Sequence, residues 1–312
     1  MKIAFIFSGQ GAQCSGMGKE LYDQFECVRN VFDSADKALG FSIKDICFNE
    51  DERINETEYT QPAILTMSMA MYALISEKGI KADYVAGLSL GEYSALTASG
   101  VFNFEDAVCL VRKRGRFMTE AVPKGQGAMS AVLNLDRENI EKACEEASSE
   151  SEKVWIANYN APGQIVIAGN TAAVDKADKL VIEKGAKRVV RLNVSGPFHT
   201  MLLKPASDRL NAELKNIGIN DMTIPVATNL TGDLIKDKNE IIDILTKQVM
   251  NPVRWEETIN KFISLGVDTF IELGPGKALC SFVKKISKNV KVFNIEDMKS
   301  LEKTCKGIDE KC

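Results

Sequence analysis

Histidine is nearly absent from this chain of 312 residues, which contains only His199. Its eight cysteines are scattered without a CxxC pair, so we expect no zinc site. Dispersed cysteines of this kind also favour a protein that functions in a reducing compartment. No apolar run is long enough to span a membrane, and the apolar start, Ile3 to Phe7, is too short for a signal peptide. Basic residues (39) do not outnumber acidic ones (43), which disfavours nucleic acid as a partner. These absences favour a cytoplasmic protein that contacts neither membrane nor nucleic acid.

Strand-like apolar runs alternate with helical patterns in the first and last parts of the chain. Lys2 to Phe7, Tyr84 to Gly87 and Val267 to Leu273 are typical of short buried strands, and each ends at a glycine or just before one. Helical patterns follow the strands, among them Pro62 to Lys78. This alternation predicts an α/β fold with a parallel sheet covered by helices on both faces.

The middle of the chain has a different order of elements. Residues 126–194 have a β-α-β-β-α-β pattern, which is typical of a ferredoxin-like subdomain. We therefore expect this subdomain to be inserted into a core made of residues 1–125 and 195–312. The polar tail from Leu301 onward is expected to fray.

The pattern GxSxG, from Gly87 to Gly91, stands between a predicted strand and a predicted helix. A nucleophile elbow needs this context, because the sharp turn presents the serine oxygen above the sheet and the glycines avoid backbone clashes. The pattern therefore indicates Ser89 as a nucleophile. A helix that begins with small residues and is capped by Ser89 is the alternative.

A serine nucleophile needs a base, and His199 is the one imidazole available. It follows the last strand of the middle segment, and loops at the carboxyl ends of parallel strands are where α/β sheets place their sites. As an ordinary imidazole base it would make activity fall as the pH drops through about 6 to 7. A structural histidine is the alternative, and no motif positions an acid to complete a triad.

Gly9-Gln10-Gly11 follows the first strand and admits three interpretations. A dinucleotide-binding GxGxxG loop fails at its third glycine, where Cys14 stands. A second possibility is an oxyanion hole, built from a backbone N–H of the Gln10 loop and the N–H of Leu90, the residue after the nucleophile. An ordinary tight turn is the third.

Arg114 belongs to a basic cluster on a predicted helix that begins after Asn103. Helical phasing puts Arg114 at the edge of the apolar face, whereas Lys113 and Arg116 point away from it. An arginine at the rim of a buried face needs an anionic partner. That partner is either a structural Asp or Glu, or a substrate carboxylate held by two parallel hydrogen bonds.

Six segments together resemble the malonyl-CoA:acyl carrier protein transacylase family, and they cover nearly the whole chain in order. They read FSGQGAQ, GLSLGEYSAL, RGRFMTEAVP, NYNAPGQIVIAG, SGPFHT and QVMNPVRW. The resemblance implies an α/β-hydrolase-like core with an inserted ferredoxin-like subdomain. It also implies that Ser89 is acylated, that His199 is its base, that Arg114 binds the malonyl carboxylate, and that Gln10 and Leu90 are the oxyanion donors.

Two further positions match the family, and one departs from it. Gln248 matches a residue that accepts a hydrogen bond from the catalytic histidine. Phe198 matches a pattern associated with malonyl rather than bulkier methylmalonyl units. The family commonly has histidine before the nucleophile (GHSLG), whereas this chain has Leu88. Because that histidine is not the base, we expect catalysis to survive.

The activity that the resemblance implies is transfer of malonyl from coenzyme A to acyl carrier protein through a malonyl-serine intermediate, for fatty acid synthesis. A ping-pong scheme of this kind uses the coenzyme A thioester as substrate and needs no cofactor or metal. We expect a monomer whose partners are malonyl-CoA and the carrier. The alternatives are a discrete acyltransferase of a polyketide synthase, a serine thioesterase or esterase, and a non-catalytic carrier-binding module.

Overall fold

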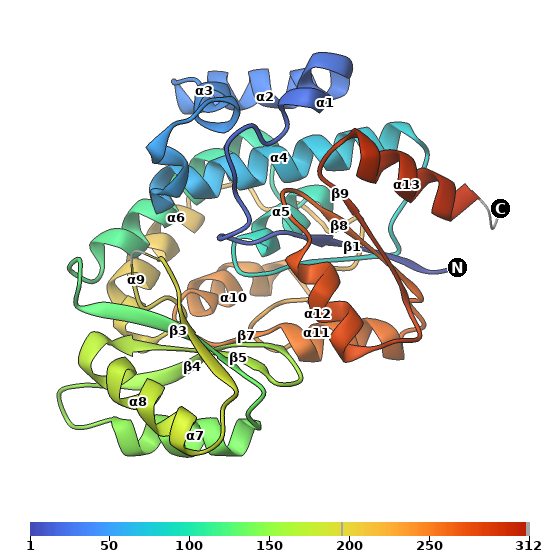
Figure 1. Ribbon diagram of the computed structural model, residues 1–312. Helices are drawn as coiled ribbons and strands as arrows, with labels where there is room; N and C mark the ends of the chain where they lie inside the picture. Colours follow the sequence, from blue (N-terminus) through green and yellow to red (C-terminus); the bar gives the residue numbers. More distant parts are fainter. Residues whose placement is uncertain (195, 310–312) are drawn as a thin grey trace.

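The computed structural model describes residues 1–194 and 196–309. The described residues form two sheets, one in the core and one in the segment that lies below the core in Figure 1. The predicted boundary residue Ser195 and the last three residues of the tail lie outside the described residues. None of the described helices is long and apolar enough to cross a membrane.

The core sheet has four parallel strands in the order β2-β1-β8-β9. Their bounds are Tyr84–Gly87 for β2, Ile3–Phe7 for β1, Thr269–Leu273 for β8 and Lys291–Ile295 for β9. In the register, Phe7 is opposite both Gly87 and Leu273, so three strands end together. The predicted parallel sheet is confirmed, and its carboxyl edge carries the loops at 8–12, 88–90 and 274–277.

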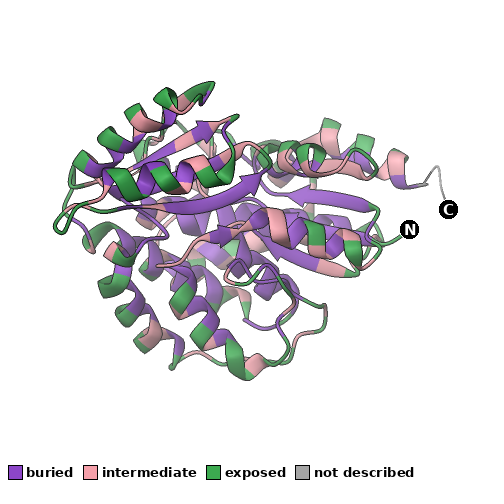
Figure 2. Cartoon of the chain, turned by 90° about the horizontal axis from the view of Figure 1, so that it is seen from below, coloured by how far each residue is buried: buried purple, intermediate pink, exposed green. Residues whose placement is uncertain are grey.

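Side chains of β1 alternate between two apolar layers, as the period of a strand requires. Phe5 and Phe7 pack into the layer that includes α4 (Thr57–Glu77), while Ala4 and Ile6 pack against α11 (Trp255–Ser264) and α12 (Ala278–Ile286). Figure 1 shows these helices on opposite sides of the sheet, and Figure 2 shows buried strands between helices with exposed outer faces. The core is thus a three-layer α/β structure.

The other core helices lie around these layers. They are α1 (Lys19–Gln24), α2 (Glu26–Leu39), α3 (Ile43–Phe48), α5 (Gly91–Ala98), α6 (Phe104–Glu120), α9 (Lys204–Leu214), α10 (Ile241–Gln248) and α13 (Met298–Asp309), with short 3-10 turns at Glu52–Asn55, Met201–Leu203 and Lys238–Glu240. The expectation of a frayed tail is wrong for 301–309, because α13 buries Leu301 and Ile308. Its apolar face has a helical period that the polar composition concealed.

The middle segment forms the predicted ferredoxin-like unit. Its elements are β3 (Gly127–Leu133), α7 (Arg137–Ala147), β4 (Val154–Ala161), β5 (Gln164–Asn170), α8 (Thr171–Glu183) and β6 (Arg188–Arg191). The strands pair antiparallel in the order β6-β3-β5-β4, and an apolar cluster of their own fills the space beneath α7 and α8. One strand of the core, β7 (Val253–Arg254), adds to β4 in parallel and ties the two parts together. We propose that the subdomain begins at residue 126 and ends at residue 194.

Candidate active site

Ser89 sits in a sharp turn between β2 and α5, with a positive φ of 53°. The surrounding backbone passes so close to Gly87 and Gly91 that neither position can accommodate a side chain. A Cβ on Gly87 would lie 1.9 Å from the carbonyl of Gly91, and a Cβ on Gly91 would lie 2.2 Å from the carbonyl oxygen of Phe7. The glycine spacing therefore serves the elbow, and a strained conformation at Ser89 is typical of a functional position.

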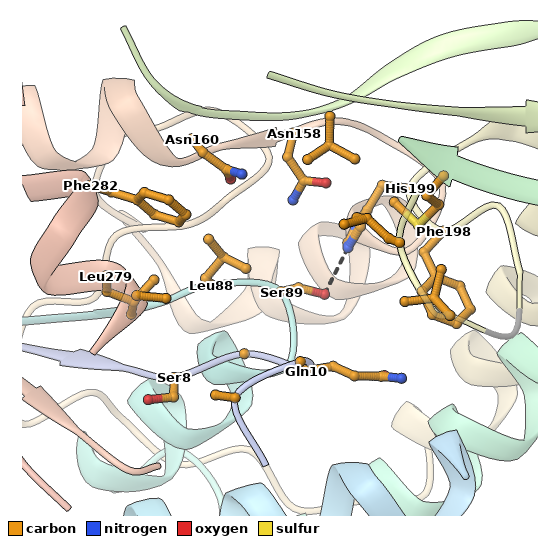
Figure 3. A pocket seen from close by; sticks show the side chains of 18 of the residues that line it. Ser8, Gln10, Leu88, Ser89, Asn158, Asn160, Phe198, His199, Leu279 and Phe282 are labelled. Atoms are coloured by element: carbon orange, nitrogen blue, oxygen red, sulfur yellow. Dashed lines mark hydrogen bonds between the residues drawn. The ribbon is translucent and has the colours of Figure 1, made fainter. Parts of the chain in front are cut away.

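His199 meets Ser89 across the cavity, as the dashed line in Figure 3 shows. The Oγ of Ser89 lies 2.7 Å from Nε2 of His199, and Nδ1 lies 2.9 Å from the backbone carbonyl oxygen of Gln248. A carbonyl oxygen only accepts, so Nδ1 carries the hydrogen and Nε2 is left to accept the proton of Ser89. This is the tautomer that a general base needs, held without an acidic side chain.

The surroundings of His199 keep its imidazole in the neutral form, which can act as a base. Burial first, and the positive charge of Arg114 second, lower the pKa of His199 to about 4, and the bond to the Gln248 carbonyl opposes them. His199 also has a positive φ, of 62°, and is almost fully buried. The expectation of an ordinary histidine pKa is therefore wrong, because the sequence does not reveal that the ring is enclosed beside a cation.

Arg114 is buried under the nucleophile, with 1% of its surface exposed. Its guanidinium donates to the side-chain oxygens of Gln61 (2.9 Å) and Gln248 (3.1 Å) and to the Oγ of Ser89 (3.3 Å). It also stacks over the ring of Tyr93 at 5.1 Å.

Within the described part of the chain Arg114 forms no ion pair, and its Nε–H has no hydrogen-bond partner. Its neighbours on α6 behave as the phasing predicts: Lys113 and Arg116 are exposed and pair with Glu213 and Glu120. A buried cation whose hydrogen bonds all go to neutral groups, next to a nucleophile, is suited to bind a substrate carboxylate.

The two predicted oxyanion donors flank Ser89. Among the described residues, none accepts a hydrogen bond from the backbone N–H of Gln10 or of Leu90. The side chain of Gln10 donates to Thr57 at 3.0 Å, which fixes the loop after β1. Free N–H groups at the carboxyl ends of two adjacent strands can stabilise an oxyanion there.

Gln248 uses its backbone and its side chain for different contacts. The histidine bonds to its backbone carbonyl, while its side-chain amide donates to the carbonyl of Ser89 and to Glu92, both at 2.9 Å. The histidine partner is thus the main chain at position 248, a distinction that the sequence does not reveal. The amide oxygen accepts a hydrogen bond from Arg114 and so connects this guanidinium to the residue that holds His199.

Asn229 and Glu92 are among the residues of the site that sequence reasoning missed, as are Gln61 and Tyr93 beside Arg114. Asn229 clamps the elbow, since its side chain accepts from the N–H of Ser89 at 2.6 Å and donates to the carbonyl of Gly87 at 2.8 Å. Nothing near Asn229 in the sequence marks it. Glu92 was detectable as the lone charge in the otherwise uncharged helix α5.

A cavity of about 230 Å³ opens above the Ser89–His199 pair. Phe198 lines it beside His199, and Leu88 lines it where it packs with the apolar layer of α12 (Figure 3). The other lining residues come from the loop after β1, from α6, from the subdomain strands and the segment after β6, from β8 and from α12: Ser8, Gly9, Gln10, Gly11, Ala12, Met118, Met129, Asn158, Asn160, Val166, Leu192, Val194, Glu272, Ala278, Leu279 and Phe282. The cavity therefore lies between the core and the subdomain. Among the described residues, no group of three or more His, Cys, Asp or Glu is placed to hold a metal.

Comparisons of sequence and of structure with known proteins both find acyltransferases. The acyl transferase domain family matches residues 4–307. The malonyl CoA-acyl carrier protein transacylase of Bacillus subtilis (strain 168) is 46% identical over 310 residues, which is 99% of this chain and 98% of that protein. The crystal structure of the corresponding transacylase from Clostridium perfringens is 49% identical, with a TM-score of 0.96 over 99% of this chain and 98% of that one.

A third relative was solved together with a carrier. It is a malonyl-transacylase in complex with a type II polyketide synthase acyl-carrier protein, 38% identical, with a TM-score of 0.96. The match covers 98% of this chain and all of that one. The likeness thus includes both the core and the subdomain.

The depressed pKa of His199 predicts where the nucleophile loses its reactivity. The neutral ring is the base, so the rate at which a fluorophosphonate labels Ser89 should stay high at neutral pH. It should fall only as the pH drops through about 4. His199→Ala should remove this limb and slow labelling by roughly 10²- to 10⁴-fold. A midpoint between 6 and 7 in the free protein would contradict the enclosed, cation-flanked site.

Proposed function

The chain belongs to the acyl transferase domain family, and we propose on that premise that its Ser89 carries a malonyl group from malonyl-CoA to acyl carrier protein. The enzyme is an acyl-carrier-protein S-malonyltransferase that supplies fatty acid synthesis. One observation carries the proposal: the buried guanidinium of Arg114, without an ionic partner among the described residues, donates to the Oγ of the nucleophile. A malonyl thioester offers a free carboxylate close to the carbonyl under attack.

Acylation follows from the positions of Ser89 and His199. Nε2 of His199 takes the proton of Ser89 as its Oγ forms a bond to the thioester carbon. The oxygen of the tetrahedral intermediate accepts from the N–H groups of Gln10 and Leu90, while Arg114 holds the malonyl carboxylate. The carbon–sulfur bond then breaks, and coenzyme A leaves with the proton from His199.

Deacylation runs these steps in the opposite direction with a different thiol. His199 takes the proton of the phosphopantetheine thiol, the sulfur attacks the malonyl-Ser89 ester, and the proton returns to Oγ as the ester bond breaks. Binding and proton transfer account for every step, so we propose that the enzyme needs no cofactor. Coenzyme A takes part only as the leaving half of the substrate.

Two alternatives are disfavoured by particular contacts. A thioesterase or esterase has no evident use for a buried cation at the nucleophile, and a non-catalytic carrier-binding module has no use for a 2.7 Å contact between Ser89 and His199. A discrete acyltransferase of a polyketide synthase remains a second candidate. The relative solved with a polyketide synthase carrier supports it, at 38% identity.

We further propose that the enzyme acts as a monomer in the cytoplasm and contacts neither nucleic acid nor membrane. Cys14, Cys27, Cys47, Cys109, Cys144 and Cys280 carry free thiols, as a reducing compartment allows. Phe198, buried beside His199 in the cavity wall, is proposed to favour malonyl over bulkier methylmalonyl units.

Intact-protein mass spectrometry tests the function directly. After mixing with malonyl-CoA, the wild-type chain should gain one malonyl group, and peptide mapping should place it on Ser89. Addition of holo acyl carrier protein from fatty acid synthesis should then discharge it, faster than a polyketide synthase carrier does. Absence of the adduct would refute the transferase assignment, and preferential discharge to the polyketide carrier would favour the second candidate.

Arg114 is predicted to set the preference for malonyl over acetyl. Loss of the partner of a buried charge costs on the order of 2–5 kcal/mol, so Arg114→Ala should lower kcat/KM for malonyl-CoA by about 10²-fold or more. Acylation by acetyl-CoA should hold steady or improve, and Arg114→Lys should rescue malonyl only in part, because it lacks the planar fork.

Arg116→Ala, an exposed change two residues along the same helix, is the matched control and should leave both substrates unaffected. Competitive labelling with both thioesters measures the ratio. A strong malonyl preference in Arg114→Ala would mean that the carboxylate is recognised elsewhere.

A further inference from the structure

Glu92 is a carboxylate with no exposed surface, in the first turn of α5 three residues after the nucleophile. The mechanism above gives it no task. One of its oxygens, Oε2, accepts two hydrogen bonds, from the backbone N–H of Asn229 at 3.0 Å and from the side-chain amide of Gln248 at 2.9 Å. Both donors belong to segments that hold the catalytic pair.

The bond to Asn229 reaches Ser89. With its backbone anchored on Glu92, Asn229 directs its side chain to the N–H of Ser89 and the carbonyl of Gly87, on either side of the elbow. These two bonds hold the turn in which Ser89 adopts its positive φ. Any shift of Asn229 therefore moves the nucleophile.

The bond to Gln248 reaches His199 and Arg114. The amide nitrogen of Gln248 has two acceptors, Oε2 of Glu92 and the carbonyl of Ser89, so the amide oxygen must face Arg114 and accept from it. The backbone carbonyl of the same residue holds Nδ1 of His199. An acceptor at Oε2 thus sets the orientation of the amide that faces the guanidinium, and it anchors the residue whose backbone carbonyl holds the imidazole.

We propose that Glu92 is a positioning residue that aligns Ser89, His199 and Arg114 through the two hydrogen bonds accepted by its Oε2. This inference rests on the proposed function for its substrate but not for its geometry. A different role is conceivable for the same side chain, that of a counter-charge to Arg114, since Glu92 favours the charged form of that guanidinium. The two roles require different properties of residue 92, namely reach and charge.

Two conservative variants separate reach from charge. Glu92→Gln keeps the length and can place its amide oxygen where Oε2 stands, and the other oxygen, Oε1, has no hydrogen-bond partner among the described residues. The hydroxyl of Thr228, which also favours the charged form of Glu92, can either donate or accept and so can adapt to the amide. Glu92→Asp keeps the charge but withdraws the acceptor by one methylene. If Glu92 acts by positioning, Glu92→Gln should keep the reactivity of Ser89 and Glu92→Asp should lose it. If Glu92 acts as a counter-charge, Glu92→Asp should keep that reactivity and Glu92→Gln should lose it.

The readout is the rate at which a fluorophosphonate labels Ser89, a reaction that forms an oxygen–phosphorus bond and releases fluoride. We expect Glu92→Gln to label within about threefold of wild type and Glu92→Asp at least tenfold more slowly. Acylation by malonyl-CoA and by acetyl-CoA should both fall in Glu92→Asp, in contrast to Arg114→Ala, which affects malonyl alone. Labelling of Glu92→Asp as fast as, or faster than, Glu92→Gln would overturn the proposal.

The same pair of changes at Glu213 is the control. Glu213 is half-buried on α9 and pairs with Lys113 of α6 at 2.7 Å, remote from Ser89. Its Gln and Asp variants should label at the wild-type rate. Because the fluorophosphonate reaction needs no malonyl group, failure of wild type to accept malonyl would refute the proposed function and leave the Glu92 comparison valid.

Discussion

The buried guanidinium of Arg114 is the constraint on which the rest of the site depends. A cation enclosed in the protein must be solvated by fixed dipoles or by a counter-ion, and here Gln61, Gln248 and the face of Tyr93 take the place of water. These groups are neutral, so they compensate the charge only in part. A carboxylate brought by the substrate would complete the compensation, so we propose that selection for malonyl follows from how the core is packed.

The same charge determines the state of the base. Arg114 and burial together hold His199 neutral, and the Gln248 carbonyl fixes the tautomer that accepts from Ser89. Once a carboxylate neutralises Arg114, one cause of the depressed pKa is removed. We propose that the imidazole then becomes a stronger base when malonyl is in place, which couples substrate binding to activation of the nucleophile through a single arginine. An acetyl group provides no such coupling.

Local patterns in the sequence were enough to predict the parallel sheet, the ferredoxin-like unit and the elbow at Ser89, because glycine spacing and strand periodicity depend on neighbouring residues. Helical phasing likewise separated buried Arg114 from exposed Arg116. Contacts between distant segments could not be read in this way. The clamp from Asn229, the use of the Gln248 main chain and the enclosure of His199 each depend on where segments 49 to 140 residues away along the chain come to lie. The ordered helix α13 was also not predicted, because only its apolar face, which packs against the core, shows that the polar tail is held in place.

The chain's single histidine makes the coupling between Arg114 and the base directly measurable, since its imidazole signals in an NMR spectrum belong to one residue. Titration of these signals should give a midpoint near 4 in the free protein, and saturating malonate should raise it. In Arg114→Ala the midpoint should already be higher and should not respond to malonate. A free-protein midpoint at the ordinary histidine value, or no movement when malonate binds wild type, would contradict the account.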